Sequence, residues 1–321
     1  DLSGEEDTDL ANGTIVMYEP EVDLPELERV AGFKEENPDL KTLLSIGGWT
    51  LSHNLSDVAA DPEARQTLAE SAVDFIREFN MDGLDVDWEY PVRPDWGAGH
   101  ANNAERDEDS ENWLLLLEDI RQALDEAGAE DGKEYLLTMA GGQQAWFIQG
   151  LDLEKASNYL DYFAVMAYDT HGTWAQMTGH NAPLYPNDIE IDLVGWSDGS
   201  VDLAVNEMKA ANVSDEKIIL GLAFYGQAWQ GCNPEDDQAY NIERGPHQEC
   251  FGGAANIDTG YDSITQLVNQ DGYEYYWDNQ SKVPYLYNEI KGEFVSYDNV
   301  ESLQYKVNYI KDNHLGGAMI W

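Results

Sequence analysis

The chain alternates short apolar, β-branched runs with longer amphipathic stretches. The short runs are hydrophobic on both faces, as in buried strands, and the stretches between them have the apolar spacing of helices. The predicted strands lie at 42–48, 83–90, 135–142, 162–169, 217–226 and 316–321. The predicted helices lie at 62–79, 113–127, 153–160, 203–211 and 300–311. This alternation predicts a parallel sheet, and so many repeats favour a (β/α) barrel over a short doubly wound sheet.

Three segments interrupt the alternation. Residues 102–111 form an acidic, Asn-rich loop, and residues 170–198 form a second, longer loop. The stretch after Gly226 is rich in Gly, Asn and aromatic residues and contains short strand-like pieces. It is too long for a plain loop, so we expect a small inserted α+β subdomain at 227–290, within a barrel domain formed by residues 1–226 and 291–321.

Six predicted strands fall short of the eight that a closed barrel requires. Residues 1–23 hold only one short apolar piece, 14–18, ahead of a predicted helix at 24–34, so the first two barrel strands are missing. No eighth helix follows Trp321. An open sheet would expose two long edges, and we therefore expect the sequence to be part of a longer protein.

Carboxyl groups crowd one predicted strand. Because side chains in a strand alternate, Asp85, Asp87 and Glu89 share one face, opposite an apolar face that should be buried. Neighbouring buried acids repel one another, which raises some of their pKa values, and a carboxyl protonated near neutral pH suits a general acid. Asp82 has the wrong parity for this face and is expected to hold the start of the strand.

In a barrel the carboxyl end of each strand faces the active site, which places Glu89 nearest the substrate, with Asp87 and Asp85 deeper. One alternative is a carboxylate row that binds Mg²⁺ or Ca²⁺, but no nearby His or second acidic strand completes a ligand shell. A purely structural row would be costly to bury. We therefore expect acid catalysis without a metal or other cofactor.

Aromatic residues gather near the predicted strand ends. Indole rings stack well on sugar rings, although any one of them is more often a packing residue. The tryptophans concerned are Trp49, Trp88, Trp146, Trp174, Trp229 and Trp321. Tyr168 is a candidate for a hydroxyl in the pocket or, alternatively, a packed core tyrosine. Asp169 has the opposite parity and joins Tyr168 only if the chain is already turning there.

The charge balance is extreme, with 63 acidic residues against 17 Lys plus Arg and a net charge of -46. Nucleic acids and anionic membranes are therefore poor partners. Periodic apolar segments persist between the acids, which indicates a charged surface over an ordinary core. Molar salt screens such a surface to a Debye length of roughly 3 Å, so we predict a halophilic protein. No signal peptide or membrane-spanning stretch is visible.

Only two cysteines are present, Cys232 and Cys250. A disulfide between them would contribute roughly 3 kcal/mol by closing the intervening loop. Two unrelated free thiols are the alternative, because the sequence cannot show that the sulfurs meet.

Residues 82–89 resemble the signature of the family 18 glycoside hydrolases, the chitinases, in which three Asp and one Glu have this spacing. Four further motifs resemble those of the family, in family order, at 45–49, 166–169, 224–226 and 316–321. Residues 276–287 resemble the inserted α+β subdomain of the bacterial-type chitinases, and the acidic composition resembles that of haloarchaeal proteins. The resemblance implies a (β/α)8 TIM barrel with this insertion.

The resemblance implies a substrate-assisted, retaining mechanism. Glu89 would protonate the glycosidic oxygen while the acetamide oxygen of the substrate attacks its own anomeric carbon. Asp87 would orient the acetamide and then contact Glu89, and Asp85 would share a proton with Asp87, so that the pair titrates as a unit.

The resemblance also assigns the sugar contacts. Tyr168 would hydrogen-bond the acetamide, Asp169 would contact the sugar, and Trp321 would form the floor beneath it. Further substrate contacts are expected from Trp49, Trp88, Tyr90, Met166, Trp174 and Tyr225. One departure is Gln227, where the family usually has an Arg, so a charged contact is lost or supplied elsewhere.

We therefore expect a secreted, monomeric, endo-acting or processive chitinase that cleaves β-1,4 bonds between N-acetylglucosamine units. One alternative is an endo-β-N-acetylglucosaminidase acting on N-glycans, although the insertion favours a cleft for a long chain. The other is an inactive chitin-binding lectin. Such lectins typically replace the terminal acid of the signature, and Glu89 is intact.

Overall fold

The computed structural model describes residues 12–92, 100, 102–188, 199–232, 245–270 and 272–321. The predicted loop at 170–198 therefore lies outside the described residues from 189 onward. The chain divides into two compact units. The first unit comprises residues 1–141, 149–164 and 211–213, and the second comprises 142–148, 165–210 and 214–321.

All six predicted strands are present and form one parallel sheet in the order β1-β2-β3-β4-β5-β10. They are β1 (Leu43–Gly47), β2 (Gly83–Asp87), β3 (Leu136–Gly142), β4 (Tyr162–Met166), β5 (Ile218–Leu222) and β10 (Gly317–Ile320). Several end earlier than the apolar pattern predicts. In the first unit β2 pairs with β1 and β3, and this register places Asp85 beside both Ser45 and Thr138. In the second unit β5 pairs with β10.

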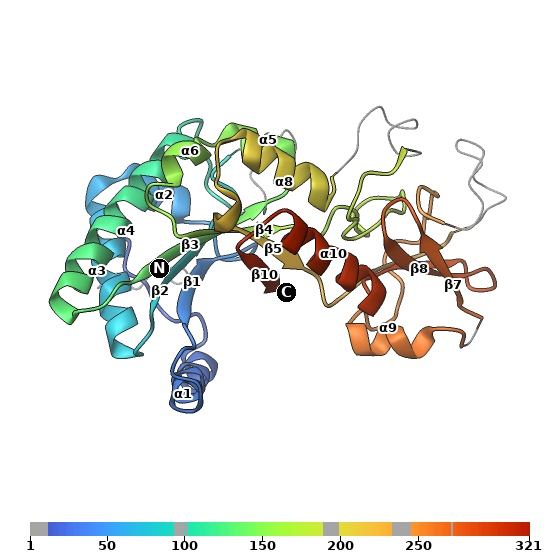
Figure 1. The fold of residues 1–321 in the computed structure, drawn as a ribbon, viewed down its shortest axis with the longest axis horizontal. Helices are drawn as coiled ribbons and strands as arrows, with labels where there is room; N and C mark the ends of the chain where they lie inside the picture. Colours follow the sequence, from blue (N-terminus) through green and yellow to red (C-terminus); the bar gives the residue numbers. More distant parts are fainter. Residues whose placement is uncertain (1–11, 93–99, 101, 189–198, 233–244, 271) are drawn as a thin grey trace. The chain divides into compact units, whose positions relative to one another are not determined.

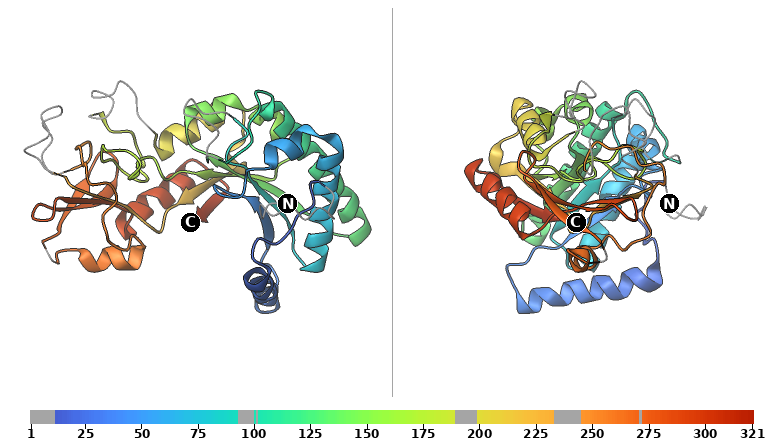
Figure 2. Two further views of the ribbon diagram at one scale, coloured as in Figure 1. Left: turned by 180° about the vertical axis from the view of Figure 1, so that it is seen from behind. Right: turned by 90° about the vertical axis from the view of Figure 1, so that its right-hand side faces the viewer.

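The helices of the first unit bury one face each, with the exception of α1. They are α1 (Pro20–Glu36), α2 (Leu55–Ala60), α3 (Pro62–Glu78), α4 (Asp109–Asp131) and α6 (Leu153–Ala156), while α5 (Ala145–Gly150) runs from the second unit into the first. Asp61 caps α3 by accepting the Glu63 N–H, and Pro62 occupies its first turn. Helices α2, α3 and α4 lie side by side (Figure 1). Helix α1 buries no residue and stands apart from α3 and α4 (Figure 2).

The second unit contains α8 (Val201–Ala210), a short 3-10 helix at Asp215–Lys217, α9 (Tyr261–Leu267) and α10 (Val300–Asp312). Helix α10 begins with a capping box between Asn299 and Ser302. Its Lys306 is fully buried, and Nζ lies 2.6 Å from Oδ2 of Asp298. Among the helices of the described residues, none combines the length and the apolar character that a membrane-spanning helix requires.

The second unit also carries an antiparallel sheet in the order β6-β9-β8-β7. Its strands are β6 (Gln227–Gln230), β9 (Glu293–Ser296), β8 (Val283–Asn288) and β7 (Glu274–Asp278). Residues alternate between its two faces, as strand geometry requires. One face packs Leu286 and Val295 with Ile264 of α9. The other packs Trp229, Tyr287 and Phe294 with the cysteines.

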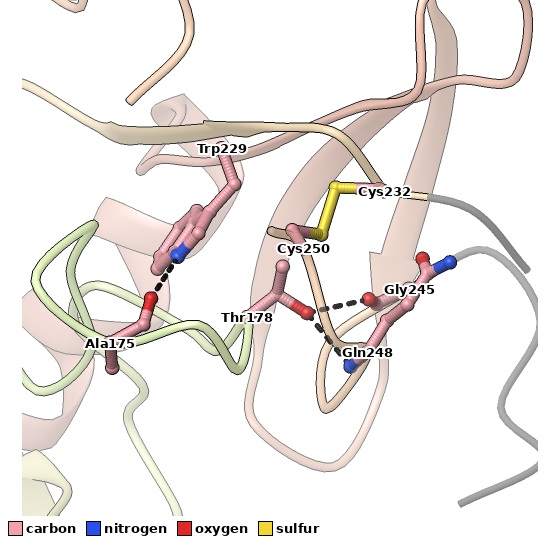
Figure 3. The surroundings of a disulfide bond; sticks show 7 residues. All are labelled: Ala175, Thr178, Trp229, Cys232, Gly245, Gln248 and Cys250. Carbon is pink, nitrogen blue, oxygen red and sulfur yellow. Dashed lines mark hydrogen bonds between the residues drawn. A yellow bond between two sulfur atoms is a disulfide. The ribbon is translucent and has the colours of Figure 1, made fainter. Parts of the chain in front are cut away.

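The two cysteines form a disulfide, so the free-thiol alternative is wrong (Figure 3). The linked segment also holds the loop that follows β4. The Cys250 N–H donates to the Gln176 carbonyl at 2.8 Å, and the Thr178 hydroxyl donates to the Gly245 carbonyl at 3.0 Å. The Trp229 indole N–H donates to the Ala175 carbonyl at 3.0 Å. The disulfide therefore anchors this loop together with strand β6.

Removing the disulfide should destabilise the protein. We expect a double variant, Cys232→Ser with Cys250→Ser, to lose about 3 kcal/mol of unfolding free energy, because the unfolded chain regains the entropy of the open loop. Denaturant titration in molar salt measures the loss. A reducing agent should destabilise the wild type by a similar amount and leave the variant unchanged. Equal unfolding midpoints for both proteins would contradict the expectation.

Candidate active site

The acid row, which we define as Asp85, Asp87 and Glu89, follows the alternation of side chains along β2. Leu84 and Val86 are fully buried on one face, whereas Asp85 and Asp87 lie on the other. The strand ends at Asp87, so Glu89 lies just beyond it and is buried. At the other end Asp82 accepts the Thr42 N–H at 2.9 Å and pairs with Nζ of Lys34 at 2.5 Å. Asp82 therefore holds the start of the strand.

Asp85 is held by hydroxyl groups from both neighbouring strands. Ser45 Oγ donates to Oδ2 at 2.9 Å, and Thr138 Oγ1 donates to Oδ1 at 2.5 Å. Burial raises the pKa of Asp85, and the two hydrogen bonds oppose that rise only in part. Ser45 belongs to the motif at 45–49, but neither it nor Thr138 was predicted as a partner of Asp85. In-register parallel strands place equivalent positions side by side, so the parity of the flanking strands could have indicated both.

Asp87 has no such support. Its Oδ1 is buried and has no hydrogen-bond partner within the described ranges. Burial, followed by the negative charges of Glu89 and Asp85, raises the pKa of Asp87 to about 7. A carboxyl group in this position exchanges its proton near neutral pH, which is the property that proton transfer requires.

The paired glycines at the end of β1, Gly47 and Gly48, allow a close approach to Asp87. Gly47 has a φ of 100°, and a Cβ there would lie 2.2 Å from the Asp87 carbonyl oxygen. The Gly48 N–H donates to the same oxygen at 2.6 Å. Any side chain at position 47 would push the turn away from β2, so glycine is required there.

The backbone around Glu89 is fixed from two sides. Its N–H donates to Ser52 Oγ at 3.0 Å, and its carbonyl accepts from Nδ2 of Asn103 at 2.7 Å. Ser52 in turn donates to the Gly48 carbonyl at 2.8 Å. The turn after β1 and the acidic loop thus hold the segment that carries the candidate proton donor. Ser52 and Asn103 gave no signal in the sequence, because both are loop residues distant from the motif.

The aromatic candidates of the first unit differ in exposure. Trp88 is 2% exposed and lies on the apolar side of the row. Trp49 is 45% exposed and makes edge-on contacts with Tyr90 and His100, at ring-centre distances of 6.4 and 6.0 Å. Of these three candidates, Trp49 presents the most open ring for stacking.

In the second unit, Tyr168 and Asp169 follow the end of β4 at Met166. Asp169 has a φ of 53°, so the chain turns at that residue. The parity of the strand predicted that Asp169 could lie on the same side as Tyr168 only if the chain turned there. Tyr168 is buried, and its ring contacts that of Tyr225 edge-on with centres 6.1 Å apart. Its hydroxyl lies 3.8 Å from Sδ of Met319. Met166 packs against the same cluster.

Amide groups surround Asp169. Its N–H donates to Oδ1 of Asn181 at 3.0 Å, and its Oδ1 accepts from Nε2 of Gln227 at 2.9 Å. Burial, then the Asp169 carboxylate, raises the pKa of Tyr225, so that phenol stays protonated. Gln143 donates to the Tyr168 carbonyl at 2.9 Å. Neither Asn181 nor Gln143 was predicted from the sequence pattern.

Two further indoles of the second unit are open to solvent. Trp174 is 68% exposed and Trp321 is 71% exposed. The backbone of Trp321 is fixed, because its N–H donates to the Leu222 carbonyl at 2.9 Å and its carbonyl accepts the Phe224 N–H at 2.8 Å. Within the described part of the chain, no group of three or more His, Cys, Asp or Glu side chains is arranged to hold a metal ion.

The chain is similar to known glycoside hydrolases over most of its length. The model of the family described as "Glycosyl hydrolases family 18" matches residues 6–321. Chitinase A1 of Niallia circulans is 40% identical over 97% of this chain and 46% of its own length. The chain thus spans about half the length of this curated relative.

Solved structures agree in fold. Chitinase ChiA74 from Bacillus thuringiensis is 40% identical, with a TM-score of 0.83 over 92% of this chain and 48% of its own. A chitinase from Cycas revoluta in complex with (GlcNAc)3 is 27% identical, with a TM-score of 0.78 over 95% of this chain and 82% of its own. These matches confirm the predicted (β/α)8 TIM-barrel class with an antiparallel insertion.

Asp87 should leave a signature in the pH dependence of stability. Its pKa in the folded protein, about 7, exceeds the ordinary value of about 3.9, so the folded state binds the proton more tightly. The resulting stabilisation is complete below about pH 4 and is lost as the pH rises to about 7. We therefore expect Asp87→Asn to gain stability relative to wild type over this range, by up to about 1.4 kcal/mol per pH unit.

Denaturant titrations from pH 4 to pH 8 in molar salt measure this difference. Asp74→Asn is the matched control, because Asp74 is an exposed acid on α3. It removes the same charge at the surface, and the pH dependence of Asp87→Asn is read relative to it. A stability difference for Asp87→Asn that stays flat with pH would show that Asp87 titrates as an ordinary carboxyl group.

Proposed function

Because the chain belongs to glycosyl hydrolase family 18, we propose that it hydrolyses chitin, cleaving β-1,4 bonds between N-acetylglucosamine units. The observation that carries this proposal is the acid row of β2. Asp87 sits between two further acids, has a pKa raised to about 7 and keeps one buried oxygen without a described partner. A general acid and an adjacent carboxyl group that titrates near neutral pH suit the chemistry of a retaining glycosidase.

In the first step Glu89 gives its proton to the glycosidic oxygen, and the bond from that oxygen to the anomeric carbon breaks. The acetamide oxygen of the same sugar forms the replacement bond to the anomeric carbon, so no carboxylate nucleophile is needed. In the second step Glu89 takes a proton from water, and the water oxygen displaces the acetamide oxygen. Two displacements at one carbon return the original configuration.

Asp87 and Asp85 have different tasks in this scheme. Oδ1 of Asp87 accepts the acetamide N–H and thereby aims the acetamide oxygen at the anomeric carbon. The Asp87 carboxylate also stabilises the positive charge that develops on the acetamide. Asp85 is held in place because its oxygens accept hydrogen bonds from the hydroxyl groups of Ser45 and Thr138. Its negative charge helps to raise the pKa of Asp87.

The remaining candidates bind the sugar. The Tyr168 hydroxyl donates to the acetamide, and Asp169 accepts a sugar hydroxyl. Tyr225, with its raised pKa, supplies a phenol that remains a donor. The more open rings provide stacking surfaces, with smaller contributions from the buried or half-buried candidates. In the first unit these contacts come from Trp49, Trp88 and Tyr90, and in the second from Met166, Trp174 and Trp321.

The setting of the enzyme is part of the proposal. We assign residues 1–226 and 291–321 to the catalytic barrel and residues 227–290 to the inserted subdomain. The disulfide suits an oxidising compartment and therefore a secreted protein, which we take to be a monomer. A neutral polysaccharide is not repelled by a surface with a net charge of -46.

Replacing the proton donor tests the mechanism. We expect Glu89→Gln to lower hydrolysis of chitin oligosaccharides at least about 100-fold, because an amide cannot protonate the leaving oxygen. Oligosaccharide binding should persist, because the side chain keeps its size. Product chromatography and calorimetric titration, both in molar salt, measure the two effects.

Glu78→Gln, on the exposed surface of α3, is the matched control and should hydrolyse as fast as wild type. Full activity of Glu89→Gln would end the proposed mechanism. Binding without turnover by the wild type would instead identify a lectin, and cleavage of high-mannose glycoprotein but not of chitin would identify a glycan-releasing enzyme.

Salt should stabilise the fold. We expect the melting temperature to rise steadily from low to molar sodium chloride, because screening weakens the repulsion among 63 acidic residues that face only 17 Lys and Arg. Calorimetric melting curves measure the rise. Sucrose at matched osmolality separates screening from general exclusion effects and should not substitute for salt. A melting temperature that is flat or falls with salt would refute the halophilic assignment.

A further inference from the structure

Asn181 lies at the junction of three segments of the second unit. It follows β4 in the long loop and is 1% exposed. Its side-chain Oδ1 accepts the Asp169 N–H at 3.0 Å, and its Nδ2 donates to the Tyr225 carbonyl at 3.3 Å. Its backbone N–H donates to Ser296 Oγ of β9 at 2.8 Å. One buried residue thus connects the end of β4, the segment after β5 and the antiparallel sheet.

The chemistry of the junction requires an amide. The same side chain must accept one hydrogen bond and donate another, and both of its partners are backbone groups. A carboxylate of the same shape could not donate to the Tyr225 carbonyl, and an apolar side chain could do neither. Because the site is buried, a lost partner leaves an unsatisfied polar group, which is costly.

Asp169 needs this support because its backbone is in a left-handed conformation. A φ of 53° is uncommon for a residue other than glycine and persists only where surrounding contacts hold it. Asn181 holds the Asp169 N–H, while Gln143 holds the adjoining Tyr168 carbonyl and the Thr170 hydroxyl at 2.9 and 2.8 Å. The Asn181 carbonyl accepts the Thr170 N–H at 2.9 Å. The turn that aims the Asp169 carboxylate is therefore set by buried amides.

We propose that Asn181 is a positioning residue of the hydrolase: anchored to Tyr225 and Ser296, it holds Asp169 in the orientation that contacts the substrate. The inference rests on the proposed function, in which Asp169 accepts a sugar hydroxyl. Asn181 itself touches no substrate and acts through Asp169. Small displacements of a positioning group lower the rate strongly, because the reacting geometry is narrow.

A double-mutant cycle separates this role from a merely structural one. Asn181→Ala should lower kcat/KM for chitin oligosaccharides about tenfold or more in the wild-type background, the effect of one lost buried hydrogen bond that acts on the substrate contact. In the Asp169→Ala background the same substitution should lower kcat/KM less than about threefold, because the group that it positions is already absent. A structural residue lowers activity by the same factor in both backgrounds.

Asn187→Ala is the matched control. Asn187 is a buried asparagine of the same loop, but its Nδ2 donates to Oδ2 of Asp278 at 2.8 Å, a hydrogen bond that does not involve Asp169. It should affect melting temperature without changing kcat/KM beyond about twofold. If Asn181→Ala does not fold, as judged by circular dichroism in molar salt, Asn181→Ser takes its place in the cycle.

The outcomes distinguish the two proposals. An active wild type with equal losses in both backgrounds overturns the positioning role and leaves the proposed function standing. A wild type that binds chitin oligosaccharides without cleaving them overturns the proposed hydrolysis, and the same cycle is then read in the dissociation constant, where equal losses again overturn the positioning role. A wild type that neither binds nor cleaves overturns both.

Discussion

The removal of carboxyl groups from water at the end of β2 is the constraint on which the first unit depends. Burial of Leu84 and Val86 fixes the strand between β1 and β3, and the pleat then places Asp85 and Asp87 together on the other face. Asp85 accepts hydrogen bonds from two hydroxyl groups, whereas Oδ1 of Asp87 accepts none from the described residues. This difference in hydrogen bonding, between alternate positions of one strand, is the basis for the different tasks that we propose for the two acids.

In the second unit, the Asp169 carboxylate has a different environment from that of Asp85 and Asp87. Asp169 is surrounded by the neutral amides of Asn181 and Gln227, which donate or accept hydrogen bonds without adding a positive charge. Because both amides are uncharged, the negative charge of Asp169 remains available to the neighbouring Tyr225. That charge adds to the effect of burial in raising the pKa of Tyr225, which keeps its phenol protonated. The amide of Gln227 therefore holds the Asp169 carboxylate without placing a positive charge beside it.

The local parts of this arrangement could be predicted from the sequence, and the long-range parts could not. Apolar runs located all six parallel strands, and a period of two placed Asp85 and Asp87 on one face. Strand ends were overestimated, as at Asp87, because an apolar pattern does not report where a ladder partner stops. Asn181 was missed because its partners lie 12, 44 and 115 residues away and are reached only through the fold. The pairing of Cys232 with Cys250 needed coordinates for the same reason.

The difference between buried and exposed charges also determines how strongly each acid should respond to salt. Salt screens solvent-exposed charges, and it reaches buried groups much less. Acidic residues greatly outnumber the cations, and those at the surface should respond to salt, whereas the fully buried Lys306–Asp298 pair should be screened much less. The largest cause of the raised pKa of Asp87 is burial, and the charge of Glu89 comes second. Because the dominant cause is insensitive to screening, molar salt should leave the proton affinity of Asp87 largely intact.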